Sequence, residues 1–443
     1  MRALVVPGVT DMNKGDQALV WESVRVAQDT ELFDSVYILS SGDTEEEEEK
    51  LCSQSKESGY ILLDNILPHP RRGMHKETEG GRDDITTLLL MVFFSVIDFL
   101  HLNFLLLVCN SKIITNLFFT KKTTNFINEF RTIDVVFVKG GGFIHSYGGF
   151  SSPYLIWFFL FYIRLAKRMK KKVIILPNSY GPFKGFTVSN QIRSTLKGLN
   201  LISARESVSY NAINELLNSK AFLSPDLGFY LEAESIQKEK VIDLLNNHFP
   251  DKQKRIVGIT VRPWRFPGSE DPVQSYSNYI SSVVELIRHI ESKGYYVALC
   301  NQSIGPNAHE DDRNAIKDVL TEVPSATWIN ENLTCRELKL LYSHFEFFVG
   351  TRFHSVIFSL TSKVPSIAIG YGGNKAKGIM SFFELENYTV SIDDVESKQL
   401  IKMFDSLEIN KNSLQAQLGE KLEDVFKQRE LLIENIKKSI VPA

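Results

Sequence analysis

The segment VVFVKGGG at residues 135–142 is a run of hydrophobic residues that ends in a lysine and three glycines. An uninterrupted run of β-branched and aromatic residues is typical of a strand that is buried on both faces of a parallel sheet. Similar short runs recur along the chain, and longer patterns typical of helices separate them. The strands that we expect are residues 3–6, 36–39, 135–139, 173–176, 201–204, 257–261, 296–300, 347–349 and 366–369.

This alternation predicts an α/β protein with two Rossmann-like domains that face a central cleft. A chain of 443 residues is also too long for one ordinary hydrophobic core. We expect the first domain at residues 1–230, with an insert at about 71–125, and the second at 255–395. The charged stretch 232–254 is predicted to link them, and residues 396–443 to form C-terminal helices, the last packing back across both domains.

The composition excludes several classes of protein. Lysine and arginine number 50 against 53 aspartates and glutamates, so no overall positive field favours nucleic acid. The four cysteines lie far apart and no His or carboxylate cluster has ligand spacing, so we expect neither a disulfide framework nor a metal site. The N-terminal MRALVVPG is typical of a strand that enters a glycine turn and lacks the features of a secretory signal, so we expect a cytoplasmic protein.

Two apolar segments raise the question of membrane contact. Residues 88–109 contain an aspartate, a histidine and an asparagine, which would be costly at the centre of a bilayer. Residues 154–163 run into a basic stretch at 164–172, a pattern that suits a helix on an anionic membrane surface. A buried helix whose basic end complements its own dipole explains the same pattern. Peripheral contact with the inner membrane is therefore left open.

Motifs at strand ends deserve a functional reading because ligands of α/β sheets bind at the carboxyl edge. The first, GVTDMNKGDQAL at residues 8–19, follows a strand and opens a helix, where backbone N–H groups attract anions. Its spacing is neither that of a dinucleotide fingerprint nor that of a P-loop. Gly15 would let the backbone approach a ligand. Asp16 is either a helix cap or a residue that acts on the substrate.

Two further loops have the same position after a strand. Gly140, Gly141 and Gly142 form either a nest for a phosphate or sugar or a tight turn from strand to helix. Asn178 lies in the loop PNSYGPF at residues 177–183, which either contacts substrate or serves as a rigid turn.

Arginines occur at two strand ends, where a guanidinium suits a carboxylate or a phosphate. Arg205 follows the strand at 201–204, and its alternative is an ion pair with Glu206 or with Asp226, which would then orient it. Arg262 follows the first strand of the second domain, and a surface salt bridge is its alternative.

The sharpest cluster is GTRFHS at residues 350–355, which contributes Arg352, His354 and Ser355. A cation and an imidazole two residues apart, where a strand enters a helix, can hold an anion and exchange a proton. The next strand is followed by YGGNKAKG at residues 371–378, where Lys377 lies in a loop that either wraps a phosphate or is merely solvated.

Taken in order, these motifs resemble the polysaccharide pyruvyl transferase family. The resemblance covers about residues 1–380, and its most specific part is the Arg-x-His-Ser motif with the Tyr…Lys…Gly motif that follows it. It implies a fold like that of the two-domain GT-B glycosyltransferases, phosphoenolpyruvate as donor and a glycan as acceptor. It also implies that Arg205 binds the donor's carboxylate or phosphate, and that His354 binds the donor and takes part in proton transfer. The first motif, TDMNK at residues 10–14, and the long insert depart from the family and leave the acceptor's identity open.

These residues suggest a mechanism in which phosphoenolpyruvate is a co-substrate and no cofactor is needed. Its negative charges would be met by Arg205, Arg352 and Lys377, with Arg262 and Ser355 also on the donor side. His354 would handle one proton transfer, and Asp16 would assist with the other. We expect residues of the first domain to meet the acceptor or to shape its backbone loops, namely Gly15, Gly140, Gly141, Gly142 and Asn178.

The partners expected are phosphoenolpyruvate and a surface polysaccharide or its lipid-linked precursor, which would gain a pyruvate ketal. Two other functions fit the same pattern. A glycosyltransferase that uses a nucleotide sugar would also need cations at strand ends. A non-catalytic glycan-binding protein would tolerate substitution of the three residues Arg205, Arg352 and His354.

Overall fold

The computed structural model describes residues 1–72, 85–236, 238–371 and 375–441, and the side chains of 375–377 are not described. The chain forms two compact units, and each is described by itself. Unit 1 comprises residues 1–11, 19–227 and 427–443. Unit 2 comprises residues 12–18 and 228–426. The expected domain boundaries therefore shift, because the short segment 12–18 groups with the second unit and the last helix is divided.

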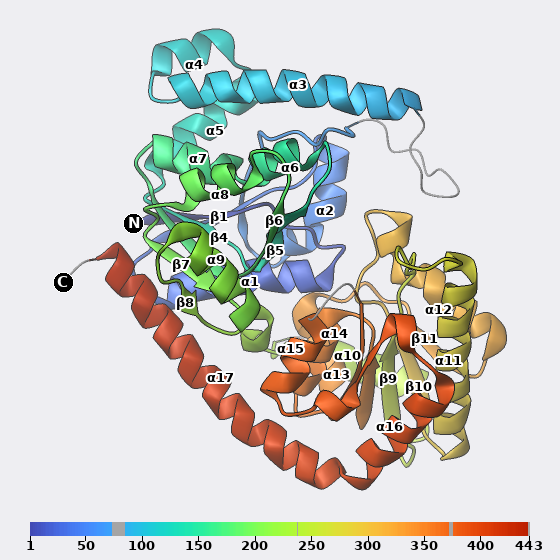
Figure 1. The fold of residues 1–443 in the computed structure, drawn as a ribbon. Helices are drawn as coiled ribbons and strands as arrows, with labels where there is room; N and C mark the ends of the chain where they lie inside the picture. The colour runs from blue at the N-terminus through green and yellow to red at the C-terminus, as the bar shows by residue number, and fades with distance from the viewer. Residues whose placement is uncertain (73–84, 237, 372–374, 442–443) are drawn as a thin grey trace. The chain divides into compact units, whose positions relative to one another are not determined.

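Unit 1 is built on a parallel sheet whose strand order is β3-β2-β1-β4-β6-β7-β8, with β5 paired to β6 (Figure 1). This 3-2-1-4 arrangement is that of a Rossmann fold. All four residues of β4 are buried, as expected for a strand covered on both faces. The strands are β1 (Arg2–Val6), β2 (Ser35–Leu39), β3 (Ile61–Leu63), β4 (Val135–Val138), β5 (Gly141–Tyr147), β6 (Lys172–Lys184), β7 (Leu201–Ala204) and β8 (Phe222–Leu223).

Helices pack on this sheet and complete the core of unit 1. Thr44 caps the glutamate-rich helix α2, since its hydroxyl accepts from the backbone N–H of Glu47. Figure 1 shows α3 lying outside the layer formed by α6 and α7. The helices are α1 (Lys14–Asp29), α2 (Glu45–Glu57), α3 (Ile85–Val108), α4 (Lys112–Phe118), α5 (Lys121–Thr132), α6 (Ser152–Phe159), α7 (Phe161–Arg168), α8 (Val188–Leu196) and α9 (Ser207–Leu217).

The apolar stretch 154–163 spans α6 and the start of α7. Most of its large side chains are buried in the core of unit 1, among them Trp157, Phe161 and Ile163. At the basic end of α7, Lys167 donates to the last carbonyl groups of α8. The segment is thus a buried helix with a basic end, and the alternative of a helix on a membrane surface is wrong for these residues.

Unit 2 is a second parallel sheet, with strand order β11-β10-β9-β12-β13-β14. Numbered within the unit, this is 3-2-1-4-5-6, the order of the dinucleotide-binding Rossmann fold. The strands are β9 (Ile256–Thr260), β10 (Tyr296–Cys300), β11 (Thr327–Ile329), β12 (Phe347–Gly350), β13 (Ser366–Gly370) and β14 (Thr389–Ser391). The prediction of an α/β protein with two Rossmann-like domains is confirmed.

The helices of unit 2 begin within the stretch that we predicted to be a linker. Residues 238–248 of that stretch form α10, which groups with unit 2 and packs on α13. The helices are α10 (Lys238–His248), α11 (Pro272–Ser292), α12 (Asp312–Glu322), α13 (Cys335–Ser343), α14 (Phe353–Leu360), α15 (Lys375–Phe382) and α16 (Ser397–Ile409), with short 3₁₀ turns at Leu227–Tyr230, Ala308–Glu310, Glu386–Tyr388 and Ile392–Asp394. The last helix, α17 (Lys411–Ile440), contributes residues 411–426 to unit 2 and 427–440 to unit 1.

Candidate active site

The carboxyl ends of β9 and β12 meet at the centre of the sheet in unit 2. The two strands pair in parallel, with Thr260 opposite Gly350. The strand order reverses between them, and this switch point is where open α/β sheets bind ligands. Arg262 follows β9, whereas Arg352 and His354 follow β12. The fold therefore brings together three of the predicted site residues.

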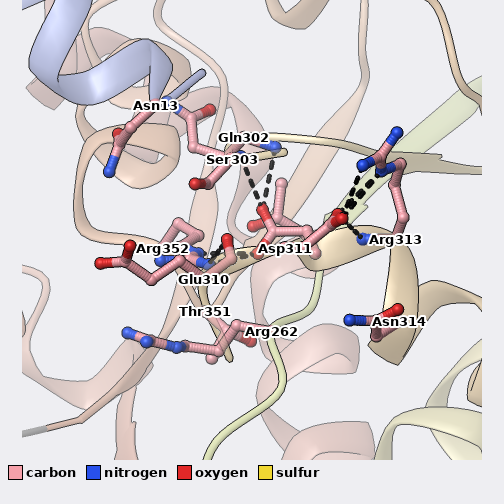
Figure 2. A network of polar contacts seen from close by, with 12 residues as sticks. Asn13, Arg262, Gln302, Ser303, Glu310, Asp311, Arg313, Asn314, Thr351 and Arg352 are labelled. Atoms are coloured by element: carbon pink, nitrogen blue, oxygen red, sulfur yellow. Dashed lines mark hydrogen bonds and ion pairs between the residues drawn. The ribbon is translucent and has the colours of Figure 1, made fainter. Parts of the chain in front are cut away.

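Arg352 forms a buried ion pair with Asp312, the first residue of α12. Its Nε and Nη2 atoms lie 2.8 and 2.6 Å from Oδ1 of the carboxylate, and Nη2 also donates to the Glu310 carbonyl oxygen at 2.7 Å (Figure 2). Both side chains are nearly inaccessible, at 8% and 0% exposure. Burial by itself would lower the pKa of Arg352, but the Asp312 carboxylate raises it overall. Arg352 is thus a fixed cation that already has one anionic partner.

The second oxygen of Asp312 fixes the loop after β10. Oδ2 accepts backbone N–H groups from Gln302 and Ser303 at 3.0 and 2.9 Å, so the carboxylate joins this loop to the arginine (Figure 2). Burial raises the pKa of the Asp312 carboxyl, whereas Arg352 and the two backbone N–H groups oppose that shift by favouring the charged form. Asp312 therefore holds the loop after β10 against the loop after β12.

Arg262 has a different environment. Its guanidinium carbon lies 4.0 Å from the ring centre of Tyr371 and 4.8 Å from that of Trp264, so both rings make cation–π contacts with it. Burial lowers its pKa, although a guanidinium remains charged at any physiological pH. Among the residues that the structure describes, no carboxylate forms an ion pair with Arg262, and its Nε is buried without a hydrogen-bond partner. The alternative of a surface salt bridge is therefore not what the structure shows.

Hydroxyl groups fix the backbone around these arginines. The backbone N–H of Arg262 donates to the Tyr279 hydroxyl, which also contacts the Thr351 hydroxyl at 3.0 Å. Burial raises the pKa of Tyr279 to about 12, so this hydroxyl stays protonated. Ser355, predicted to bind the donor, is fully buried and bonds to Thr260 and to the Arg352 carbonyl oxygen. Its hydroxyl positions the turn, and it has no surface to offer a ligand.

The first motif completes the site because residues 12–18 belong to unit 2. Asn13 pairs with Ser303 in an isolated β-bridge, and its side-chain oxygen accepts from the N–H groups of Gly15 and Asp16. Asn13 therefore caps α1, and the alternative of Asp16 as the cap is wrong. Asp16 lies in the first turn, next to Gly15. The expectation that this motif lies in the first domain is wrong for residues 12–18.

Gly15 lies directly against the His354 ring. A Cβ added at Gly15 would be 2.2 Å from Nδ1 and 2.6 Å from Cγ of the imidazole. Contacts this short are impossible, so only glycine allows the imidazole its present position. The start of α1 and the start of α14 thus meet at the predicted catalytic histidine, and Asp16 follows Gly15 in the chain.

We predict that Gly15→Ala lowers turnover by roughly 100-fold, because the imidazole must move by about 1 Å or more to make room for the methyl group. Gly268→Ala is the matched control, since nothing lies within 4 Å of a Cβ at that position. Steady-state kinetics on both variants would measure the effect. Equal turnover in the two variants would contradict the role given to this contact.

The predicted residues in unit 1 have mainly structural contacts. Arg205 forms a 2.5 Å ion pair with the buried Asp226, a longer one with Glu206, and a hydrogen bond to Ser179. The alternative prediction, an ion pair of Arg205, is therefore confirmed, and both Glu206 and Asp226 are partners. Binding of the donor by Arg205 stays a prediction.

The glycine motif after β4 is a bend between two strands. β4 ends at Val138, Gly140 lies in the bend, and Gly141–Tyr147 forms β5, so the alternative of a strand-to-helix turn is wrong. A Cβ at Gly140 would be 2.9 Å from the Pro177 carbonyl oxygen, and Gly141 has a φ of +145°, which favours glycine. Gly142 continues along β5. Asn178 is fully buried and donates to the Lys139 carbonyl oxygen at 2.7 Å, so it shapes this backbone loop.

Some residues of the site escaped the sequence analysis. Neither Asp312 nor Trp264 belongs to a recognisable motif. Only the position of Trp264, two residues after Arg262, could have indicated from the sequence that it lies at the site. His309 lies on the 3₁₀ turn beside them, and its pKa is lowered by burial and by Arg265. Lys377 lies in α15, but its side chain is outside the described part of the chain. Within the described residues, no group of three His, Cys, Asp or Glu side chains could hold a metal.

Comparison with solved structures shows the same class of fold. A plant glycosyltransferase, UGT89C1 of Arabidopsis thaliana complexed with UDP-L-rhamnose, aligns over 99% of both chains with a TM-score of 0.55 and 11% identity. UDP-GlcNAc 2-epimerase from Neisseria meningitidis bound to UDP-GlcNAc aligns over 99% of this chain and 100% of that chain, with a TM-score of 0.55 and 12% identity. At such low identity these likenesses show the GT-B-like fold alone.

Comparison at the level of sequence is more informative. The amylovoran biosynthesis protein AmsJ of Erwinia amylovora is 20% identical over 430 residues, which is 96% of each chain. Residues 13–373 match the polysaccharide pyruvyl transferase family, and this range includes residues 228–370 of unit 2, most of unit 1, and every predicted site residue from Gly15 to Ser355. With the motif order and the site geometry in agreement, the chain belongs to the polysaccharide pyruvyl transferase family.

Proposed function

We propose that this protein transfers the enolpyruvyl group of phosphoenolpyruvate to sugar hydroxyls of a surface polysaccharide or of its lipid-linked precursor, and so forms a pyruvate ketal. The family supports pyruvyl transfer. A relative named for amylovoran biosynthesis supports a glycan acceptor. The identity of the donor and the formation of a ketal go beyond these two similarities and are what we propose here.

The environment of Arg262 is the observation that supports phosphoenolpyruvate as the donor. Its guanidinium is largely withdrawn from water, is contacted by two aromatic rings, and has no carboxylate partner among the described residues. A buried cation without a counter-ion is costly, and an anionic ligand would remove that cost. A small, highly charged donor such as phosphoenolpyruvate fits this need. The Arg352 cation and the first backbone N–H groups of α14 lie at the same strand ends and favour the same kind of ligand.

The reaction balances with the residues at this site. Protonation of the donor's methylene carbon makes an oxocarbenium-like centre at the carbon that carries the phosphate. One sugar hydroxyl attacks this centre and loses its proton, and a second hydroxyl then closes the ketal ring as inorganic phosphate leaves and takes up the proton of that hydroxyl. We assign one proton transfer to His354 and the other to Asp16. Arg262 and Arg352 stabilise the charge on the donor.

The experiment is to incubate the protein with phosphoenolpyruvate and candidate lipid-linked glycans. Release of inorganic phosphate, together with a mass gain of one pyruvate less one water on the glycan, would support the proposal. Thermal stabilisation by a nucleotide diphosphate sugar but not by phosphoenolpyruvate would contradict it, and would favour a glycosyltransferase instead.

Arg262→Gln is expected to raise the KM for phosphoenolpyruvate by about 10- to 100-fold, the usual range for one lost hydrogen bond to a charged group. The same change at Arg288, an exposed arginine of α11 that pairs with Glu285, is the matched control. Initial rates over a range of donor concentrations measure the effect. A KM that is the same in both variants would remove Arg262 from the donor site.

A further inference from the structure

Helix α3 is strongly apolar although it lies at the surface of unit 1. It has 24 residues, and by length and composition it could cross a membrane. Asp98, Leu102, Leu105 and Cys109 form one stripe at helical spacing and are buried against the unit. At about 100° per residue the opposite stripe consists of Leu89, Phe93, Val96, Leu100 and Leu107. Their exposed fractions run from 53% for Val96 to 67% for Leu107.

Helix α4 continues this surface. Ile113, Leu117 and Phe118 are 80%, 72% and 59% exposed. A surface helix of a soluble protein normally presents polar residues to water, so an outer stripe with none is unusual. The outer stripe of α3 and these three residues of α4 together form what we call the apolar face, namely Leu89, Phe93, Val96, Leu100, Leu107, Ile113, Leu117 and Phe118.

The buried stripe ties α3 to unit 1. Arg72 forms a two-pronged ion pair with Asp98 at 2.7 and 3.0 Å, which neutralises the acidic residue within the helix. Phe99 packs against Trp157 of α6 with ring centres 5.0 Å apart, and Arg168 of α7 donates to the Leu106 carbonyl oxygen. The helix is thus part of unit 1, and its outer side is the side that could contact a partner.

Chain topology excludes a simple transmembrane span. The segment leaves the sheet of unit 1 after β3 and returns to the same sheet at β4. A single crossing by α3 would put these two strands on opposite sides of the bilayer. Within the described part of this segment, the return would have to be made by α4 or α5, which have 7 and 12 residues. At about 1.5 Å per residue neither spans a hydrocarbon core of about 30 Å. The helix can therefore only lie along a membrane surface.

Positive charge surrounds the end of the apolar face. Lys112, Lys121 and Lys122 are exposed. The sequence has no aspartate or glutamate between residues 99 and 128. Arg168, which contacts α3, also lines a shallow depression of about 360 Å³ with Arg164 and Lys167. An anionic surface complements these cations, whereas a second copy of the same face would bring like charges together.

We propose that α3 and α4 anchor the protein to an anionic phospholipid membrane, with the apolar face lying in one leaflet and the surrounding lysines on the phospholipid head groups. This anchoring is independent of the chemistry proposed for the active site. For an enzyme that modifies lipid-linked glycans, it would also confine the search for acceptor to the membrane plane.

The test is flotation of the full chain with vesicles, without any substrate. Wild type should bind vesicles of phosphatidylcholine mixed with phosphatidylglycerol. Phe93→Asp/Leu100→Asp should bind them at least ~10-fold more weakly, since two apolar anchors are lost. The matched control, Val273→Asp/Ile409→Asp, puts the same two charges at apolar positions of unit 2 that are 81% and 82% exposed, and should bind like wild type.

A second variant tests the charges. Lys112→Gln/Lys121→Gln/Lys122→Gln should lose about fivefold in binding per lysine on the mixed vesicles, and little on pure phosphatidylcholine. Unchanged binding of Phe93→Asp/Leu100→Asp would overturn the proposal. So would a wild type that ignores both vesicles and forms a dimer which this double variant dissociates, since the apolar face would then join two copies.

Discussion

Replacement of His354 by glutamine is expected to lower the turnover of phosphoenolpyruvate by about 10²- to 10⁴-fold, the usual contribution of general acid–base catalysis. The amide is similar in size to the imidazole and can still form hydrogen bonds, but it cannot exchange a proton near neutral pH. The KM for the donor should change much less than kcat, because the arginines and not the histidine carry the charge that holds the donor. Phosphate release under saturating donor and acceptor measures the loss.

The control for this variant is His248→Gln, which removes an imidazole from a partly exposed pair with Glu331. A surface pair of this kind contributes little, so turnover should stay close to that of wild type. If His354→Gln turned over donor as fast as His248→Gln, His354 would have no part in proton transfer. The proposed donor site could survive that result, because Arg262 is tested separately by its effect on KM.

Asp312→Ala is expected to lower the free energy of unfolding of unit 2 by about 3–5 kcal/mol, the usual cost of leaving one member of a buried ion pair without its partner. The Arg352 guanidinium would remain in a site with 8% exposure and no anion, and two backbone N–H groups would lose their acceptor. Denaturant unfolding, followed by a probe within unit 2, measures the change.

The neighbouring residue gives a matched control. Asp311 pairs with Arg313, whose side chain is 42% exposed, and it caps α12. Asp311→Ala should therefore cost only about 1 kcal/mol, mostly from the lost cap. The double variant Asp312→Asn/Arg352→Gln removes both charges of the pair and should be more stable than Asp312→Ala. Equal losses for the two alanine variants would contradict the structural role of the ion pair.

The sequence predicted the interior strands well and the edge strands poorly. All nine expected strands are present, because β-branched and apolar runs in a parallel sheet are recognisable without knowledge of their neighbours. Five strands were not predicted, namely β3, β5, β8, β11 and β14. Four of them have two or three residues, and β5 begins with two glycines, so none contains a hydrophobic run long enough to be distinguished from a loop.

The residues of the candidate site also fall into those that could be predicted from the sequence and those that could not. The motif GTRFHS and the arginine after β9 could be found in sequence because each sits where an apolar strand ends. The partner of each arginine could not, since Asp312 and Tyr371 are distant in sequence from Arg352 and Arg262 and are brought near them by the sheet order. Sequence alone therefore offered Arg205, Arg262 and Arg352 all as donor ligands, and left open whether Arg205 and Arg262 were instead held in ion pairs. Only the structure separates the two that are paired with aspartates from the one that is not.

By itself, the sequence of this protein determined two Rossmann-like sheets, the family, and a histidine with cations at strand ends, because these depend on local runs and their order. The tertiary structure alone decided that residues 12–18 belong with the second sheet, and that Gly15 rather than any larger residue lies against His354. It also decided that the apolar stretch 154–163 is core whereas 88–107 faces outward. Two apolar segments cannot be told apart until it is known which of them is covered by another layer of helices, and that depends on contacts between residues far apart in the chain.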